Sequence, residues 1–256
     1  MRKINAAMLA EGIVLSLMSV TLFLLSISGA YMYYVTPRTL PYMYFASALF
    51  LLLGMYALRN LFAIEHAKHY SHLMIVLIPL LLIVWSVKDT GIIENLALQA
   101  QNTANVQAAP SNGEGEYVMK ASSYEGTVLH GYDEKNQTIV IPQEEAYRWL
   151  VEIFDNPDPF LGYTITTMGQ VMKDPTYFDE GCFSPVRQLM TCCAADLYPI
   201  GFVCEYANTD SLTKDDWVTV TGKLQMRSFD TYRELRIVVD SVTPSAPANE
   251  PYLFSY

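Results

Sequence analysis

The sequence predicts a membrane-anchored protein, with three transmembrane α-helices followed by a mainly-β domain that closes into a small barrel. Two observations predict this architecture. Hydrophobic residues make up 52% of the 256-residue chain, a high share for a soluble domain. Charge is also divided unevenly, since residues 1–90 carry six Lys/Arg and three Asp/Glu, whereas residues 91–256 carry ten and twenty-three. Two segments of opposite net charge indicate two physical environments.

Three long uncharged runs lie near the N-terminus, at residues 12–35, 39–58 and 70–87. A helix that crosses the hydrocarbon core of a bilayer needs about 20 apolar residues, with about 17 as the lower limit. All three runs meet this requirement, and Pro79 in the third is tolerated inside a spanning helix as a kink. We therefore expect a transmembrane helical domain over residues 1–90 that contacts the lipid bilayer.

Lys and Arg in the short loops predict the orientation, because cytoplasmic loops carry an excess of these residues. Four of them lie before the first run or between the second and third runs, against two on the opposite side. This bias predicts a multi-pass protein of the cell membrane with a cytoplasmic N-terminus. Three crossings then place the C-terminal domain outside the cytoplasm; if the third run does not cross, that domain is cytoplasmic instead.

Residues 91–115 are rich in Gln, Asn, Ala, Pro, Ser and Gly and show no periodicity, which is typical of a flexible linker. Residues 116–256 follow as an acidic domain that is long enough to bury its own core. The large excess of Asp and Glu after residue 90 excludes a nucleic-acid partner, because phosphate binding needs patches of Lys and Arg.

A hairpin and a short helix are expected at the start of this domain. Residues 126–130 and 138–141 are strand-like and flank the turn-forming Tyr-Asp-Glu-Lys-Asn. Apolar side chains then follow with helical spacing over residues 143–154, at Ala146, Trp149, Leu150 and Ile153. Further strand-like runs occupy residues 162–171, 183–190, 200–205, 217–224 and 235–242. Five short strands with Gly-marked bends predict a closed barrel similar to an OB-fold, with an open sandwich as the alternative.

Three of the four histidines lie between the second and third apolar runs, at His66, His69 and His72. Residues three apart share one face of a helix, so neighbouring pairs of these side chains could bind a metal ion. The alternative is a polar, interfacial linker whose charge depends on pH.

All four cysteines lie in the acidic domain, and two of them, Cys192 and Cys193, are adjacent. They occupy segment 187–201, in which Asp196 lies three residues after the second cysteine. Adjacent side chains on a strand point to opposite faces, so the two thiols share one site only if the backbone turns there. Asp196 is then either a ligand or a cap of that turn.

Three interpretations of the cysteines are open. The first is structural, with one thiol in the core and a disulfide to Cys182 or Cys204 in an oxidising compartment. The second is a metal site built from Cys192 or Cys193 and Asp196, with Cys182, Cys204 or His130 as further candidate ligands, and thiolates with a carboxylate or imidazole favour zinc or a related transition metal. The third is thiol redox chemistry, although the chain lacks a Cys-x-x-Cys motif. No catalytic triad, phosphate loop or paired catalytic carboxylate is evident, so we expect a binding protein and not an enzyme.

Several motifs carry a family resemblance. They are Tyr-Val-Thr-Pro-Arg38, the His-bearing loop 65–72, Arg187-x-x-Met-Thr-Cys-Cys-Ala-Ala-Asp196-x-x-Pro-x-Gly201, Trp217-Val-Thr-Val-Thr-Gly222 and Pro251-Tyr-Leu. Together they resemble the YcgQ-type family of bacterial membrane proteins, over most of the chain. Such proteins are described as subunits of a two-component permease, so the resemblance implies a multi-span permease as the partner and a role in transport.

We therefore expect a membrane-anchored accessory subunit of a transport system, whose soluble domain binds a transition metal such as zinc. The alternatives are a membrane-tethered thiol-disulfide protein and a structural module braced by a disulfide.

Overall fold

The computed structural model describes residues 6–60, 118–123, 126–229 and 232–255. The chain divides into two compact units, Met1–Ala108 and Ala109–Tyr256, which we describe separately. The third apolar run, the linker expected at residues 91–115 and the three clustered histidines all lie outside the described residues. The expected count of three transmembrane helices therefore stays a prediction, since the structure describes only the first two runs.

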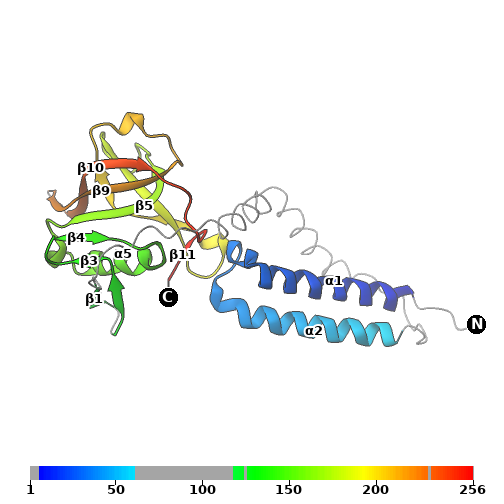
Figure 1. Ribbon diagram of the computed structural model, residues 1–256. Helices are drawn as coiled ribbons and strands as arrows, with labels where there is room; N and C mark the ends of the chain where they lie inside the picture. Colours follow the sequence, from blue (N-terminus) through cyan, green and yellow to red (C-terminus); the bar gives the residue numbers. More distant parts are fainter. Residues whose placement is uncertain (1–5, 61–117, 124–125, 230–231, 256) are drawn as a thin grey trace, which may run out of the picture. The chain divides into compact units, whose positions relative to one another are not determined.

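The first unit contains an antiparallel pair of apolar helices (Figure 1). Helices α1 (Ala6–Ser28) and α2 (Leu40–Arg59) are connected by two 3-10 turns, η1 (Ala30–Tyr33) and η2 (Pro37–Thr39). The stretches Met8–Ser28 and Pro37–Arg59 are long and apolar enough to cross a membrane, with mean hydropathies of 2.1 and 1.5. The first two expected helices are thus present, and the first ends before the Tyr-rich part of its apolar run.

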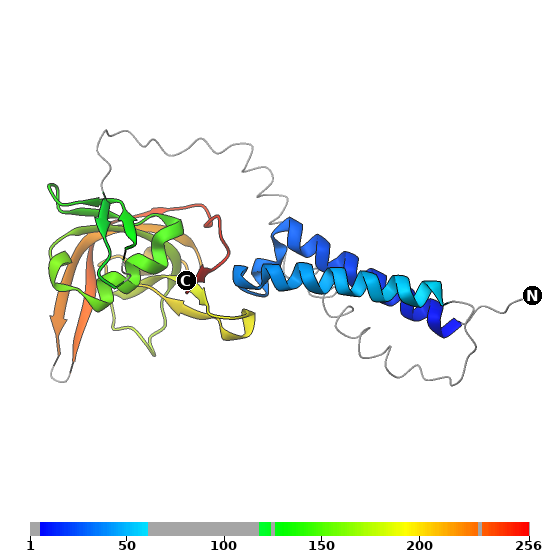
Figure 2. The ribbon, with the colours of Figure 1, turned by 90° about the horizontal axis from the view of Figure 1, so that it is seen from below.

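Small residues line the contact between α1 and α2, which run side by side in Figures 1 and 2. Ser19 Oγ donates a hydrogen bond to the carbonyl of Ser47 at 2.8 Å, and Ser47 Oγ donates one to the carbonyl of Ser19 at 3.0 Å. A Cβ added at Gly54 would lie 2.7 Å from Ser16 Oγ. Close backbone approach and polar bonds between helices are typical of packing inside membranes, where lipid removes the hydrophobic drive to associate.

We predict that Gly54→Leu destabilises this hairpin by about 1–3 kcal/mol, the usual cost of overpacking, because the new side chain collides with α1. Ala48→Leu is the matched control, since it introduces the same side chain into the same helix at an exposed position. Thermal unfolding of the full chain in detergent, followed by circular dichroism of the helical signal, measures both effects. Equal melting of the two variants would contradict the described contact.

The second unit is built around a closed five-stranded barrel (Figure 1). Its strands are β5 (Thr164–Met172), β6 (Cys182–Met190), β8 (Val203–Glu205), β9 (Trp217–Ser228) and β10 (Arg233–Pro244). Around the ring, β5 pairs with β6, β6 with β8, β8 with β10, β10 with β9, and β9 again with β5. All these pairs are antiparallel except the one between β8 and β10. If the five are numbered along the chain, the ring order is 1-2-3-5-4 with strands 3 and 5 parallel, which is OB-like topology.

The barrel closes where β5 leaves β9 and turns toward β6. Gly169 occupies this point, and a Cβ there would lie 2.5 Å from the carbonyl oxygen of Pro185 on β6. Only glycine permits backbones to approach this closely, and glycines in strands often mark the corners of barrels. The expected Gly-marked bends thus have a direct role in ring closure.

The hairpin expected before the barrel is present, but the prediction of its first strand at residues 126–130 is wrong. Strand β4 (Thr138–Val140) pairs with β3 (Tyr132–Asp133), whereas β2 (Val128–His130) pairs with β1 (Val118–Lys120). The break falls at Gly131, whose φ of 86° turns the chain between β2 and β3. Gly131 therefore separates two strands that have different partners, although the strand-like sequence pattern shows no break at this residue.

Helix α5 (Ala146–Asp155) follows a 3-10 turn, η3 (Gln143–Glu145), and confirms the expected amphipathic helix (Figure 2). Its four predicted core positions are all buried, and Trp149 is 0% exposed. Trp149 Nε1 donates a hydrogen bond to the carbonyl of His130 at 2.9 Å. On the same helix, the buried carboxylate of Glu152 accepts the amide hydrogens of Ser122 and Ser123 at 3.1 and 2.8 Å. Both side chains therefore connect α5 to the segments before the barrel.

The remaining elements are short. They are β7 (Tyr198–Ile200), β11 (Leu253–Phe254) and the 3-10 turns η4 (Asp158–Phe160), η5 (Ala194–Asp196) and η6 (Thr209–Ser211). Strand β11 runs parallel to the end of β6 and is buried there.

Candidate functional site

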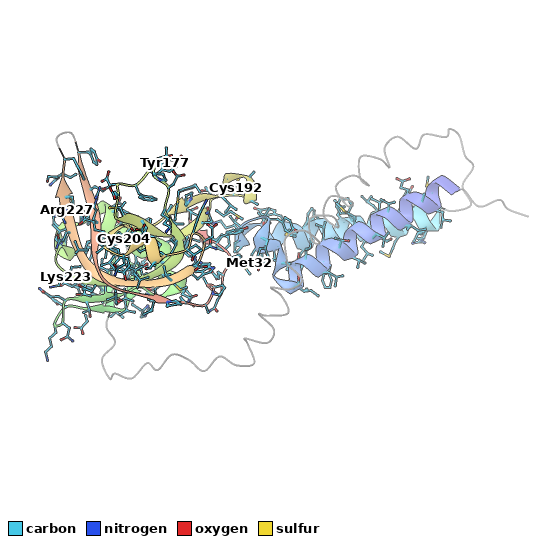
Figure 3. The ribbon with its side chains drawn as sticks, turned by 90° about the horizontal axis from the view of Figure 1, so that it is seen from above. Met32, Tyr177, Cys192, Cys204, Lys223 and Arg227 are labelled. Carbon is cyan, nitrogen blue, oxygen red and sulfur yellow. The ribbon has the colours of Figure 1, made fainter. Side chains whose placement is uncertain are left out.

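The adjacent cysteines lie in an exposed turn directly after β6. Strand β6 ends at Met190, and the turn η5 begins at Ala194, so Cys192 and Cys193 occupy the bend between them. Their Sγ atoms are 3.6 Å apart. Cys192 is exposed and Cys193 is half-buried, and Figure 3 shows Cys192 at the edge of the domain. The backbone does turn at this point, which is the condition for the two thiols to share one site.

Asp196 holds this turn from both ends. Its Oδ2 accepts the amide hydrogen of Cys192 at 2.7 Å, and its Oδ1 accepts that of Thr191 at 3.1 Å. Its own amide donates to the carbonyl of Cys193 at 3.0 Å. The capping role expected of Asp196 is therefore present, and the Cys-Cys dipeptide is held between bonds to a single residue.

The carboxylate of Asp196 also raises the pKa of Cys192. Its hydrogen bond with the thiol is the main reason that the pKa of Cys192 is raised to about 12, with the neighbouring Cys193 contributing further. The same bond is the main reason that the pKa of Asp196 is lowered. Cys192 therefore stays protonated at pH values where an ordinary cysteine ionises, which is unfavourable for direct nucleophilic attack.

We predict that Asp196→Asn increases the alkylation rate of Cys192 at pH 8, because loss of the carboxylate charge lowers the pKa of this thiol. The rate should rise several-fold, with the pH midpoint of the rate profile displaced downward. Asp210→Asn is the matched control, since it removes one exposed carboxylate from another turn of the same domain. An unchanged pH midpoint in Asp196→Asn would contradict the described interaction.

The expected metal site is only partly assembled by these residues. The turn brings Cys192, Cys193 and Asp196 together, yet both carboxylate oxygens of Asp196 already accept backbone amides. Among the described residues, no group of three or more His, Cys, Asp or Glu side chains has an arrangement suited to a metal ion. A metal bound here would need rearrangement of Asp196 or a ligand from elsewhere. The expected ligands His66, His69 and His72 lie outside the described residues.

The other two cysteines belong to the core. Cys182 is 8% exposed on β6, and Cys204 is 0% exposed on β8; Figure 3 marks Cys204 within the barrel. Burial raises the pKa of both thiols. All four cysteines are free, so the disulfide to Cys182 or Cys204 considered in the structural interpretation is not formed in this structure.

Arg187, at the start of the same sequence segment, lies in the interior. It is 3% exposed, its NH2 group donates to the carbonyl of Glu250 at 3.0 Å, and its guanidinium lies 5.6 Å from the centre of the Trp217 ring. Burial lowers its pKa. Arg187 therefore supports the segment that precedes β11. It lies outside the exposed turn of residues 191–196, which we call the thiol turn.

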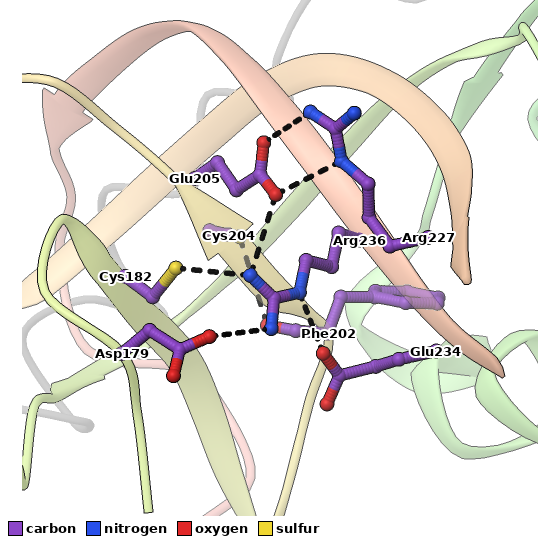
Figure 4. Close-up of polar contacts among 8 residues, drawn as sticks. All are labelled: Asp179, Cys182, Phe202, Cys204, Glu205, Arg227, Glu234 and Arg236. Atoms are coloured by element: carbon purple, nitrogen blue, oxygen red, sulfur yellow. Dashed lines mark hydrogen bonds and ion pairs between the residues drawn. The ribbon is translucent and has the colours of Figure 1, made fainter. Parts of the chain in front are cut away.

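A charged network on the outer surface of the barrel had no recognisable sequence signal (Figure 4). Arg236 on β10 is 7% exposed and binds Asp179 at 2.9 Å, Glu205 at 3.3 Å and Glu234 at 2.5 Å. Its NH1 group also lies 3.5 Å from the sulfur of Cys182. Burial alone would lower the pKa of Arg236, but the bonds to Asp179 and Glu234 raise it overall.

An open groove of about 460 Å³ lies beside this network. Its lining is mainly apolar and includes two charged residues; it consists of Phe154, Pro157, Gly201, Val203, Met226, Arg233, Glu234 and Leu235. These residues come from α5 and the segment after it, from the start of β8 and the glycine before it, and from β9 and β10, so only the fold brings them together. The volume of the groove lies within the usual range of small-molecule sites.

Comparison with known proteins places the second unit in a family. Residues 115–255 match the DUF1980 C-terminal domain. The chain belongs to this family. The matched residues include the whole barrel, the thiol turn and the charged network of the DUF1980 domain. The comparison with curated proteins gives no match.

Proposed function

We propose that the chain is a membrane-anchored accessory subunit of a transport system that works with a separate multi-span permease. The observation that carries the proposal is the apolar helical hairpin. Its outward side chains are large and apolar, for example Leu24, Phe45 and Leu52, which are 54%, 70% and 60% exposed. Such a surface is compatible with lipid and with further membrane helices. The resemblance to the YcgQ-type family supplies the class of partner.

The DUF1980 domain would act as a binding module and not as an enzyme. The turn with Cys192 and Cys193 would offer sulfur ligands to a soft or borderline ion such as zinc. Because the pKa of Cys192 is about 12, metal uptake must displace its proton and should become stronger as pH rises. On this proposal the N-terminus is cytoplasmic and the DUF1980 domain lies outside the cytoplasm.

Purification of the tagged full chain from its native membrane in a mild detergent tests the partner. A large permease should be recovered with the wild-type chain and with Ala48→Leu, and should be reduced with Gly54→Leu, which deforms the hairpin. Recovery of the chain alone in all three preparations would argue strongly against a permease complex.

Elemental analysis of the purified full chain tests the metal. Zinc should be present in stoichiometric amount in the wild type and in Cys182→Ser, and lost in the double variant Cys192→Ser/Cys193→Ser. A wild-type chain that takes up no zinc after incubation with it at pH 8 would refute this part of the proposal.

The exposed thiol of Cys192 allows the orientation to be tested without an engineered cysteine. A membrane-impermeant maleimide added to intact cells should label the wild type but not the double variant Cys192→Ser/Cys193→Ser. Labelling that appears only after the cells are opened would place the DUF1980 domain in the cytoplasm.

A further inference from the structure

We propose that Cys192 and Cys193 form a reversible disulfide with each other, which makes the turn after β6 a redox-sensitive site of the DUF1980 domain. The sulfurs are 3.6 Å apart as free thiols, and a disulfide requires a separation of about 2.0 Å. The two atoms already lie close together, so the bond closes with a movement of the two side chains and an adjustment of the peptide between them. The other two cysteines are buried in the core.

The surrounding hydrogen bonds favour this pairing over others. Asp196 accepts the amide of Cys192, and its own amide donates to the carbonyl of Cys193. The dipeptide is therefore held on both sides while its sulfurs stay on one side of the turn. Because the thiol of Cys192 is exposed and that of Cys193 is half-buried, a small reagent can approach the pair from solvent.

The covalent geometry of neighbouring residues makes such a bond easy to reverse. Adjacent Cα atoms are separated by about 3.8 Å across a trans peptide, whereas most disulfides join Cα atoms about 4.4–6.8 Å apart. Departures from the usual geometry make a disulfide more reducible, and exposed, labile disulfides are commonly the regulatory ones. The pair therefore suits a switch better than a permanent brace.

The oxidant is a second disulfide, RSSR, which is a small molecule or another protein. The thiolate of Cys193 attacks one sulfur of RSSR, forms a mixed disulfide and releases RS⁻. The sulfur of Cys192 then displaces the second RS⁻ from Cys193, and the protons of the two cysteines are taken up by the departing thiolates. The net reaction oxidises two protein thiols to one disulfide and reduces RSSR to two RSH, so two electrons are transferred.

The order of these steps follows from the position of Asp196. Its carboxylate is held beside Cys192 by the amide hydrogens of Thr191 and Cys192, and this negative charge disfavours attack by Cys192 on an external disulfide. Within the mixed disulfide, Cys192 is held next to its target and needs no encounter from solution, since proximity replaces a bimolecular step.

The test uses the reduced full chain in detergent, equilibrated with mixtures of reduced and oxidised glutathione, quenched with acid and alkylated. Cleavage after Arg187 and before Asp196 releases residues 188–195, which contain Cys192 and Cys193 alone among the cysteines. In the wild type and in Cys182→Ser, this peptide should lose both alkylation sites and the mass of two hydrogen atoms. Excess reduced glutathione should restore both sites.

Single variants distinguish formation of the Cys192–Cys193 disulfide from modification of one thiol by glutathione. In Cys192→Ser, a glutathione adduct should accumulate on Cys193, and in Cys193→Ser the adduct on Cys192 should form more slowly. Wild-type protein that carries adducts on both sulfurs, or links Cys192 or Cys193 to Cys182, Cys204 or a second chain, would overturn the proposal. Zinc on the same two sulfurs would block the bond, so the chain is freed of metal with a chelator before the assay. The reaction requires no permease, so its failure leaves the proposed transport role untouched, and the converse also holds.

Discussion

Arg236→Met should lower the free energy of unfolding of the DUF1980 domain by about 3 kcal/mol. Breaking a buried ion pair usually costs about 3–5 kcal/mol, because the remaining partner is left uncompensated. The lower end applies here, since Asp179, Glu205 and Glu234 are 68%, 26% and 30% exposed at their side chains and stay partly hydrated. Methionine keeps much of the length of arginine, so the loss of charge dominates over the loss of volume.

The loss of unfolding free energy caused by Arg236→Met should depend on pH. A hydrogen bond from Arg227 is the main cause that lowers the pKa of Glu205, and Arg236 lowers it further. A carboxylate with a lowered pKa stabilises the folded state above its unfolded pKa, and this stabilisation is lost as pH falls through the folded value. The difference between wild type and Arg236→Met should therefore be fully present at pH 7 and should narrow below about pH 4, near the ordinary range of glutamate.

Arg227→Met is the matched control, because Arg227 also binds Glu205, at 2.6 Å, but its side chain is 45% exposed. Exposed ion pairs contribute about 0–1 kcal/mol, so this variant should remain close to the wild type. Urea unfolding of the full chain in detergent, followed by tryptophan fluorescence, measures both. Equal losses in the two variants would show that burial of Arg236 does not govern the network.

Trp149→Ala should have a still larger effect, a loss of about 4 kcal/mol, within the range for removing a buried aromatic side chain. Trp149 is fully buried and contacts the rings of Tyr132 and Phe160, with centroids 6.5 and 6.1 Å away. Its removal leaves a cavity beneath α5 and leaves the carbonyl of His130 without the indole donor. Unfolding followed by far-ultraviolet circular dichroism is suitable, because this variant loses a fluorescent side chain.

Phe154→Ala provides the comparison on the same helix. Phe154 is 47% exposed and stacks on Phe202 at 5.2 Å, so its replacement should cost only about 1 kcal/mol. If Phe154→Ala were as damaging as Trp149→Ala, the groove side of α5 would be more important for stability than its buried face.

The sequence predicted those parts of the fold that depend on local patterns. Alternation along residues 217–224 identified β9, in which Val218 and Val220 are buried at 5% and 0% exposure. Helical spacing identified the buried face of α5 in the same way. The first two apolar runs were recognised from length and composition alone, because the bilayer sets a simple requirement for both.

Contacts between residues far apart in the sequence could not be predicted from these local patterns. Arg236 alternates with core residues as any outward-facing strand residue does, and its burial arises because Asp179 and Phe229 fold over it from other segments. The first arm of the hairpin was misplaced since Val128–His130 and Tyr132–Asp133 are equally strand-like. The adjacency of Cys192 and Cys193 was visible, but whether their sulfurs face each other depends on the bonds made by Asp196.

The ring order of the barrel has a consequence for how the protein is made. Strand β5 pairs with β6 over three residue pairs but with β9 over seven, and β9 is synthesised later. The carbonyl group to which Arg187 donates a hydrogen bond lies 63 residues further along the chain. When the ribosome has reached the thiol turn, β5 and β6 therefore still lack partner strands, and the guanidinium of Arg187 still lacks the segment that covers it. The domain should stay protease-sensitive and dependent on chaperones until β10 and the segment bearing β11 have emerged, so nascent chains stalled before β10 should be degraded rapidly.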